Sequence, residues 1–70
     1  MIRKPVESSN LISVGYDSKS ATLEIEFRSG DVYRYFDVAE SLYVKLMEAP
    51  SHGKFFHAHI RDKYRYAKVG

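Results

Sequence analysis

The 70-residue sequence contains no cysteine and no tryptophan. Without thiols the chain can form neither disulfides nor thiolate metal sites, so a domain this small must depend on packing, oligomerisation or attachment to a larger protein. A cysteine-free chain suits a cytoplasmic location, which is the location that we expect. The four glycines, at positions 15, 30, 53 and 70, are too scattered for a dinucleotide fingerprint or a phosphate-binding loop. We therefore expect no nucleotide cofactor.

Long hydrophobic runs are missing as well. The basic start of the chain, residues 1–4, is followed by the mostly polar residues 5–10 instead of the apolar segment of a signal peptide. No stretch approaches the roughly 18 apolar residues that a membrane-spanning helix needs. The sequence therefore predicts neither secretion nor a membrane partner.

Apolar and aromatic residues suffice for one hydrophobic core. They make up 44% of the chain, with six Tyr and four Phe, which places the sequence among globular rather than disordered chains. Since the chain is about half of the usual domain length, a second domain has no room. We predict a single domain over residues 1–70, in which residues 1–10 are irregular.

Segments of alternating polarity predict three strands, at residues 12–16, 22–28 and 32–36. The alternation is clearest in the second segment, whose odd-numbered residues are apolar and whose even-numbered residues are polar. This pattern is typical of a strand with one face on a core and the other in water.

A hairpin would join the second and third strands through the three-residue loop Ser29-Gly30-Asp31. An odd-length loop pairs odd positions with odd positions across the hairpin. Tyr33 and Tyr35 would then share the apolar face of the second strand, and Arg34 would lie opposite a glutamate on the wet face.

Two helices are predicted after the strands. Asp37 at the N-cap with Glu40 at the third helical position has the pattern of a capping box, and Pro50 would end this helix. Ser51 offers a second N-cap for a helix over residues 52–64. Its core-facing residues would be Phe56, Ile60 and Tyr64. The order of elements predicts an α+β fold, with a three-stranded antiparallel meander followed by two helices packed on one face.

Basic residues concentrate at the C-terminal end, where residues 54–70 carry five Lys or Arg against one Asp. On a continuous helix, Lys54, His57, Arg61, Arg65 and Lys68 would form one stripe because their spacings are 3, 4, 4 and 3. Such a stripe could follow phosphates, with tyrosines as flat stacking faces. The alternative is a solvated face whose cations suit the helix C-terminus. The candidate nucleic-acid-binding residues are Lys54, Arg61, Lys63, Arg65, Lys68 and Tyr64, with Tyr66 beside them.

The aromatic pair Tyr33 and Tyr35 allows two interpretations. Two phenols on one side of a strand could stack bases, as on sheet-type RNA-binding surfaces, or they could pack at the edge of the core. Among the histidines, His57 and His59 would lie about 200° apart around a helix and could not converge on one metal ion. No nucleophile elbow is present either. We therefore expect no metal site, no catalytic residue and no enzymatic activity.

Several short motifs together resemble the KTSC domain family. They are Pro5-Val6, Ser8-Ser9, Ser13-Val14-Gly15-Tyr16-Asp17, Leu23-Glu24-Ile25-Glu26-Phe27, Gly30-x-Val32-Tyr33-x-Tyr35, Ser51-x-Gly53-x-Phe55-Phe56 and Ile60-Arg61-Asp62-x-Tyr64. That family takes its name from a domain at the C-terminus of some lysyl-tRNA synthetases, and its members also occur as short free-standing bacterial proteins. Because of this synthetase context, the resemblance implies a role in binding RNA. One departure is Ala39, where the family pattern leads us to expect proline.

Our first hypothesis is a non-catalytic accessory module that binds RNA or tRNA through a C-terminal basic helix. An acidic protein surface is the other partner that the basic cluster would suit. The alternative hypothesis is a protein-interaction or self-associating module, and the sequence leaves the oligomeric state open.

Overall fold

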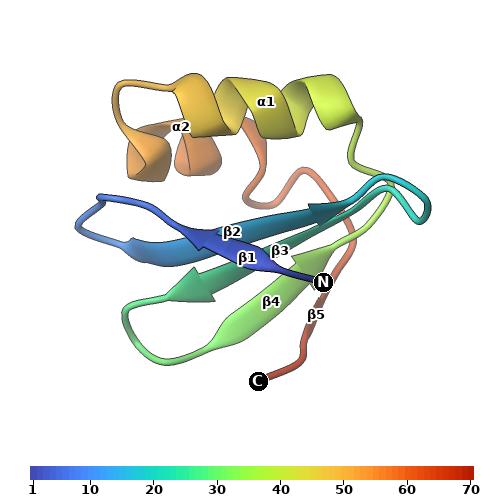
Figure 1. The fold of residues 1–70 in the computed structure, drawn as a ribbon, viewed down its shortest axis with the longest axis horizontal. Coiled ribbons are helices and arrows are strands. Elements are labelled where there is room, and N and C mark those ends of the chain that lie inside the picture. Colours follow the sequence, from blue (N-terminus) through green and yellow to red (C-terminus); the bar gives the residue numbers. More distant parts are fainter.

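Five strands and two helices make up the computed structural model, which describes residues 1–70. The elements are β1 (Arg3–Pro5), β2 (Leu11–Asp17), β3 (Thr22–Phe27), β4 (Val32–Tyr35), α1 (Glu40–Glu48), α2 (His52–His59) and β5 (Tyr66–Lys68). The strands form one antiparallel sheet in the order β1-β2-β3-β4-β5. Both helices lie on one face of this sheet (Figure 1). The α+β class and the single helical layer are as predicted.

The strand count was wrong, because the sheet has five strands rather than three. Strand β1 lies within residues 1–10, which we expected to be irregular, and β5 lies beyond the predicted helices. Each has only three residues, which is too short to show an alternating pattern. Both owe their conformation to pairing with a longer neighbour, β1 with β2 and β5 with β4.

The hairpin between β3 and β4 has the predicted faces but a different loop. Leu23 pairs with Tyr35 and Ile25 with Tyr33, so the tyrosines share the apolar face of β3. Phe27 donates its amide to the Asp31 carbonyl at 2.9 Å, which makes the loop Arg28–Gly30 instead of residues 29–31. Gly30 in this loop has a φ of +96°, which favours glycine.

The predicted capping box is wrong. Asp37 adopts a left-handed φ of 59°, and Ala39 is the N-cap of α1 without any side-chain hydrogen bond. Between them Val38 is fully buried and donates its amide to the Ala21 carbonyl at 2.9 Å. The chain therefore bends to place Val38 in the core before the helix begins at Glu40. Ala39 has a φ of −65°, a value that proline would also adopt.

Helix α2 begins as predicted and ends early. The Ser51 hydroxyl accepts a hydrogen bond from the Lys54 amide at 3.3 Å, as expected of an N-cap. At the other end, the amides of Ile60 and Arg61 both donate to the Phe56 carbonyl at 2.9 Å. Asp62 then takes a left-handed φ of 62°, and the chain turns back toward the sheet. The helix therefore ends at His59, not at residue 64.

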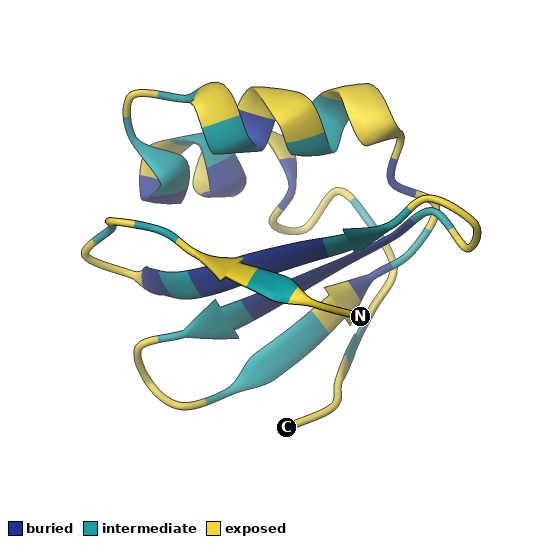
Figure 2. Cartoon of the chain, viewed as in Figure 1, coloured by how far each residue is buried: buried dark blue, intermediate teal, exposed yellow.

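A core of nine buried residues fills the space between the helices and the sheet (Figure 2). They are Leu11, Val14, Leu23, Ile25, Tyr35, Val38, Leu46, Phe56 and Ile60. Phe56 and Ile60 take the core positions predicted for them, and Tyr64 packs against the core although it lies outside the helix. Neither helix has the length and apolar character required to span a membrane.

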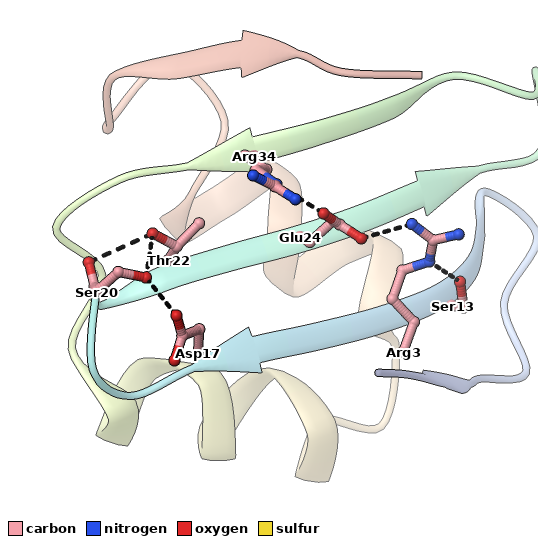
Figure 3. A network of polar contacts seen from close by, with 7 residues as sticks. All are labelled: Arg3, Ser13, Asp17, Ser20, Thr22, Glu24 and Arg34. Atoms are coloured by element: carbon pink, nitrogen blue, oxygen red, sulfur yellow. Dashed lines mark hydrogen bonds and ion pairs between the residues drawn. The ribbon is translucent and has the colours of Figure 1, made fainter. Parts of the chain in front are cut away.

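The opposite face of the sheet carries a polar network centred on Glu24 (Figure 3). One oxygen of its carboxylate accepts from Arg3 Nη1 at 2.6 Å, and the other accepts from Arg34 Nε at 2.7 Å. Arg3 also donates from Nε to the Ser13 hydroxyl at 3.0 Å. Burial alone would raise the pKa of Glu24, but the hydrogen bonds from Arg34 and Arg3 outweigh it and lower the pKa.

Candidate functional site

A pocket of about 530 Å³ opens between the sheet and the C-terminal end of α2. Its lining comes from four regions of the sequence: Asn10 before β2, the β3–β4 hairpin, α2 with the turn after it, and β5. The lining residues are Asn10, Phe27, Arg28, Ser29, Tyr33, Tyr35, Phe56, His57, Arg61, Asp62 and Tyr66. The pocket therefore combines an aromatic wall with a charged rim.

The aromatic wall is built by cross-strand pairing. Tyr66 on β5 pairs directly with Tyr35 on β4, and Tyr33, two residues before Tyr35 on β4, lies on the same face of the sheet. The ring centroid of Tyr66 lies 5.9 Å from that of Tyr35 and 5.7 Å from that of Tyr33. Phe27 and Phe56 close the wall with edge-to-face contacts, 5.8 Å from Tyr33 and 5.5 Å from Tyr35. These distances lie in the favourable range for aromatic pairs.

The tyrosines of the wall differ in exposure. Tyr35 is 6% exposed, Tyr33 is half-buried, and Tyr66 is 56% exposed. The Tyr35 hydroxyl has no hydrogen-bond partner within the chain. Every fully buried side-chain N or O atom of the protein does have a partner. This hydroxyl is therefore not fully enclosed, and Tyr35 is one of the residues that line the pocket. Burial, with smaller contributions from Tyr33 and Tyr66, raises the pKa of Tyr35 to about 12, so its phenol stays protonated at neutral pH.

Two arginines and a histidine contribute to the rim. Arg61 donates from Nη1 to His57 Nδ1 at 3.1 Å, so the neutral imidazole carries its proton on Nε2. The Nε atom of Arg61 lies 4.0 Å from the Asp62 carboxylate. From the hairpin side, Arg28 donates from Nε to the Ser8 carbonyl at 3.0 Å. Both arginines are exposed, and the Nη atoms of Arg28 and the Nη2 atom of Arg61 make no hydrogen bond within the chain.

The predicted basic stripe does not form. Because α2 ends at His59, only Lys54 and His57 of the five stripe residues lie on a helix. Arg65 instead lies over the Phe36 ring, with its guanidinium carbon 5.3 Å from the ring centroid. Lys68 lies on β5, with its ammonium 3.3 Å from the Asp31 carboxylate. The continuous periodicity of the sequence across residues 54–68 was therefore misleading.

The other candidates from the sequence also separate in space. Lys63 is exposed in the turn after α2, and Tyr64 is half-buried against the core. Lys54 lines a shallow hollow beside Pro50 and Phe55 instead of the aromatic pocket. Of the proposed nucleic-acid contacts, Arg61 and Tyr66 lie at the pocket, where they join Tyr33 and Tyr35.

Asn10 and Arg28 at the pocket were not predicted as site residues. Arg28 directly follows the last residue of β3. A basic residue at the end of an alternating strand is the one sequence signal that could have identified it. Asn10 reaches the pocket through the fold alone, since its carbonyl accepts from the Arg28 amide at 2.9 Å. No local sequence pattern marks this contact.

The three histidines have separate surroundings. His52 donates from Nδ1 to the Leu46 carbonyl at 2.8 Å, and His59 packs on Phe55 with ring centroids 4.5 Å apart. His57 contacts Arg61, as described above. No group of three or more His, Asp or Glu side chains has the arrangement of a metal site.

Fold and site together define a small α+β domain with an aromatic pocket at one end of its sheet. The family model of the KTSC domain matches residues 7–64. The chain belongs to the KTSC domain family, as its motifs predicted.

Relatives of this chain occur both as separate proteins and as parts of a larger one. A lysine–tRNA ligase from Trichormus variabilis is 40% identical over 63 residues, which are 90% of this chain and 11% of the ligase. The chain thus spans about a tenth of that enzyme. An uncharacterized protein from Stutzerimonas stutzeri is 40% identical over 70 residues, with 99% of each chain covered. The crystal structure of a KTSC domain protein from Yersinia pestis superposes with a TM-score of 0.96 at 40% identity, covering 99% of this chain and 97% of that one.

Proposed function

We propose that this KTSC domain is a non-catalytic accessory module that binds RNA, with tRNA as the class of RNA that its relatives suggest. The observation that carries the proposal is the pocket, which is lined by an aromatic wall and by two exposed arginines. The similarity to lysine–tRNA ligases supports it, because those relatives are named for an enzyme that acts on tRNA.

The chemistry of the rim suits a phosphate backbone. Guanidinium groups bind phosphate oxygens through charge-assisted hydrogen bonds, and Arg28 and Arg61 both have N–H groups available. Arg65 and Lys68 are less available, because Phe36 and Asp31 already engage them. We therefore assign the principal phosphate contacts to Arg28 and Arg61, with smaller roles for the rest of the C-terminal basic residues.

A salt titration tests this proposal. Binding of a single-stranded RNA to cations releases counterions, so the logarithm of the affinity should fall linearly with the logarithm of salt concentration, by about 0.7 for each phosphate contact. Arg61→Ala should weaken binding and make this slope shallower by about 0.7. Lys45→Ala is the charge-matched control, since Lys45 is exposed on α1 and does not line the pocket. It should leave the slope unchanged.

Three outcomes would contradict the proposal: no measurable RNA binding, a flat salt response, or equal losses from Arg61→Ala and Lys45→Ala. Concentration-dependent mass or stability without RNA binding would instead favour the self-associating module.

A further inference from the structure

The aromatic wall is not explained by the stability of the fold alone. Tyr66 leaves more than half of its surface exposed while its ring lies within 6 Å of two other tyrosines. The core beside it ends in the buried rings of Tyr35 and Phe56, and Tyr66 itself is not among the buried residues. A flat aromatic surface that stays open beside a pocket is available for stacking with a ligand.

The size of the pocket restricts the ligand. At about 530 Å³ it lies within the range of about 300–1000 Å³ that is common for sites holding one small molecule or group. A base inside a duplex could enter such a pocket only by leaving its stack. The pocket therefore fits a nucleotide that is already unpaired, in a single strand, a loop or an end.

The two arginines that line the pocket are exposed, whereas Tyr35 at the same pocket is buried. Arg28 comes from the β3–β4 hairpin, and Arg61 comes from the turn after α2. The Nη atoms of Arg28 and the Nη2 atom of Arg61 make no hydrogen bond within the chain. One carboxylate, that of Asp62, shares this rim, so the two arginines leave it cationic. This arrangement would place phosphates at the rim and a base against the tyrosines.

We infer that the pocket captures one unpaired base of an RNA, stacked on the Tyr66 ring with the tilted Tyr33 ring beside it, while Arg28 and Arg61 hold the neighbouring phosphates. The inference rests on the proposed RNA-binding function and adds the position and the kind of contact. Stacking accepts every base because each has an aromatic face, so little discrimination among the four bases is expected.

Two oligomers separate base capture from phosphate binding. One is a ten-nucleotide oligoadenylate, and the other is a fully abasic ribose-phosphate oligomer of the same length, so both carry the same backbone charge. The abasic oligomer should bind about 5- to 100-fold more weakly, because stacking on an aromatic side chain contributes a factor of that order.

Matched variants of Tyr66 connect this difference to the pocket. Tyr66→Phe keeps the aromatic ring and should keep the preference for oligoadenylate. Tyr66→Thr removes the ring but keeps the strand preference of a β-branched residue, and it should bring the two affinities together. Thermal unfolding of both variants shows whether β5 remains in place.

The outcomes distinguish the inference from the function on which it rests. Equal binding of the two oligomers by the wild type, or equal losses on both oligomers in a folded Tyr66→Thr, would overturn base capture and leave the RNA-binding proposal standing. No binding of either oligomer would remove both. A preference for oligoadenylate that Tyr66→Thr abolishes and Tyr66→Phe retains is the result that we expect.

Discussion

Leu23 and Glu24 are neighbours on β3, and the two faces of the sheet bury them in different ways. Leu23 is fully buried beneath the helices, within the aliphatic part of the core. Glu24 points to the other face and is 6% exposed, although no helix covers it. The side chains of Arg3 and Arg34 cover it instead (Figure 3).

The difference shows how a chain of 70 residues can cover both faces of a sheet with only one layer of helices. On one face, apolar packing supplies the larger stabilisation, since burial of an aliphatic side chain removes it from water. On the other face, the Glu24 carboxylate accepts hydrogen bonds from two arginines, whose side chains cover the centre of the sheet. The aromatic pocket lies at the border of the helix-covered face, where Phe56 and His57 of α2 line it together with residues of β4 and β5.

The largest expected effect comes from the helix-covered face. Leu23→Ala should lower the free energy of unfolding by about 2–5 kcal/mol, because it removes buried methyl groups and leaves a cavity. Urea denaturation measures this loss, which should be equal at pH 7 and at pH 4 since no titrating group is involved. A loss below 1 kcal/mol would mean that the helices pack loosely on β3.

A smaller effect with a different signature is expected on the open face. Glu24→Gln should lower the free energy of unfolding by about 1–3 kcal/mol at pH 7, the usual contribution of hydrogen bonds to a charged group. Glu26→Gln is the matched control on the same strand and face. Its side chain is 30% exposed and lies 3.9 Å from Arg3, so its loss should be smaller.

The pH dependence of Glu24 has a defined sign. Its folded pKa lies below the ordinary value of 4.5, so the unfolded chain takes up this proton first as the pH falls. The stability it supplies is complete above pH 4.5 and is lost as the pH falls through the folded pKa. The free energy of unfolding of Glu24→Gln should therefore fall less steeply with decreasing pH than that of the wild type. Asp17, whose pKa is lowered by hydrogen bonds from Ser20 and Lys19, retains its own contribution in both. An equal loss of unfolding free energy at acid pH in the wild type and in Glu24→Gln would contradict the stabilising role of the ionised Glu24.

Strong local signals in the sequence were enough to predict the centre of this fold. The alternation in β3 gave its two faces correctly, including the apolar side shared with Tyr33 and Tyr35. Ser51 was recognised as an N-cap because its role depends on the amide of Lys54, three residues away. Both inferences use contacts that are local or that follow from strand pairing.

The features that failed depend on contacts distant in sequence. Asp37 and Glu40 have a valid capping-box spacing, but burial of Val38 outweighs it. The periodicity of residues 52–64 continues past the true end of α2, because Tyr64 still packs on the core after the chain has turned. The pocket was not predictable as a unit, since only the folded chain brings Arg28 and Arg61 to the same pocket.

The smallest expected effect tests why the polar network on the open face needs Gly15. A Cβ atom at this position would lie 2.9 Å from the Ile2 carbonyl oxygen and 3.0 Å from Arg3 Cγ. Gly15 pairs with both Arg3 on β1 and Glu24 on β3, so its missing side chain lets the arginine cross β2 to the carboxylate. Gly15→Ala should displace Arg3 and cost about 1 kcal/mol of unfolding free energy.

A double-mutant cycle shows whether that loss passes through Glu24. If Gly15→Ala acts by moving Arg3, its cost should shrink in a Glu24→Gln background, with a coupling of at least about 0.5 kcal/mol. Combined with Leu46→Ala on α1, whose side chain lies in the core on the other face, the same substitution should be additive. Additivity in both backgrounds would mean that Gly15 accommodates only the backbone of β1. The cost of Gly15→Ala would then be independent of the polar network on one face and of the core on the other.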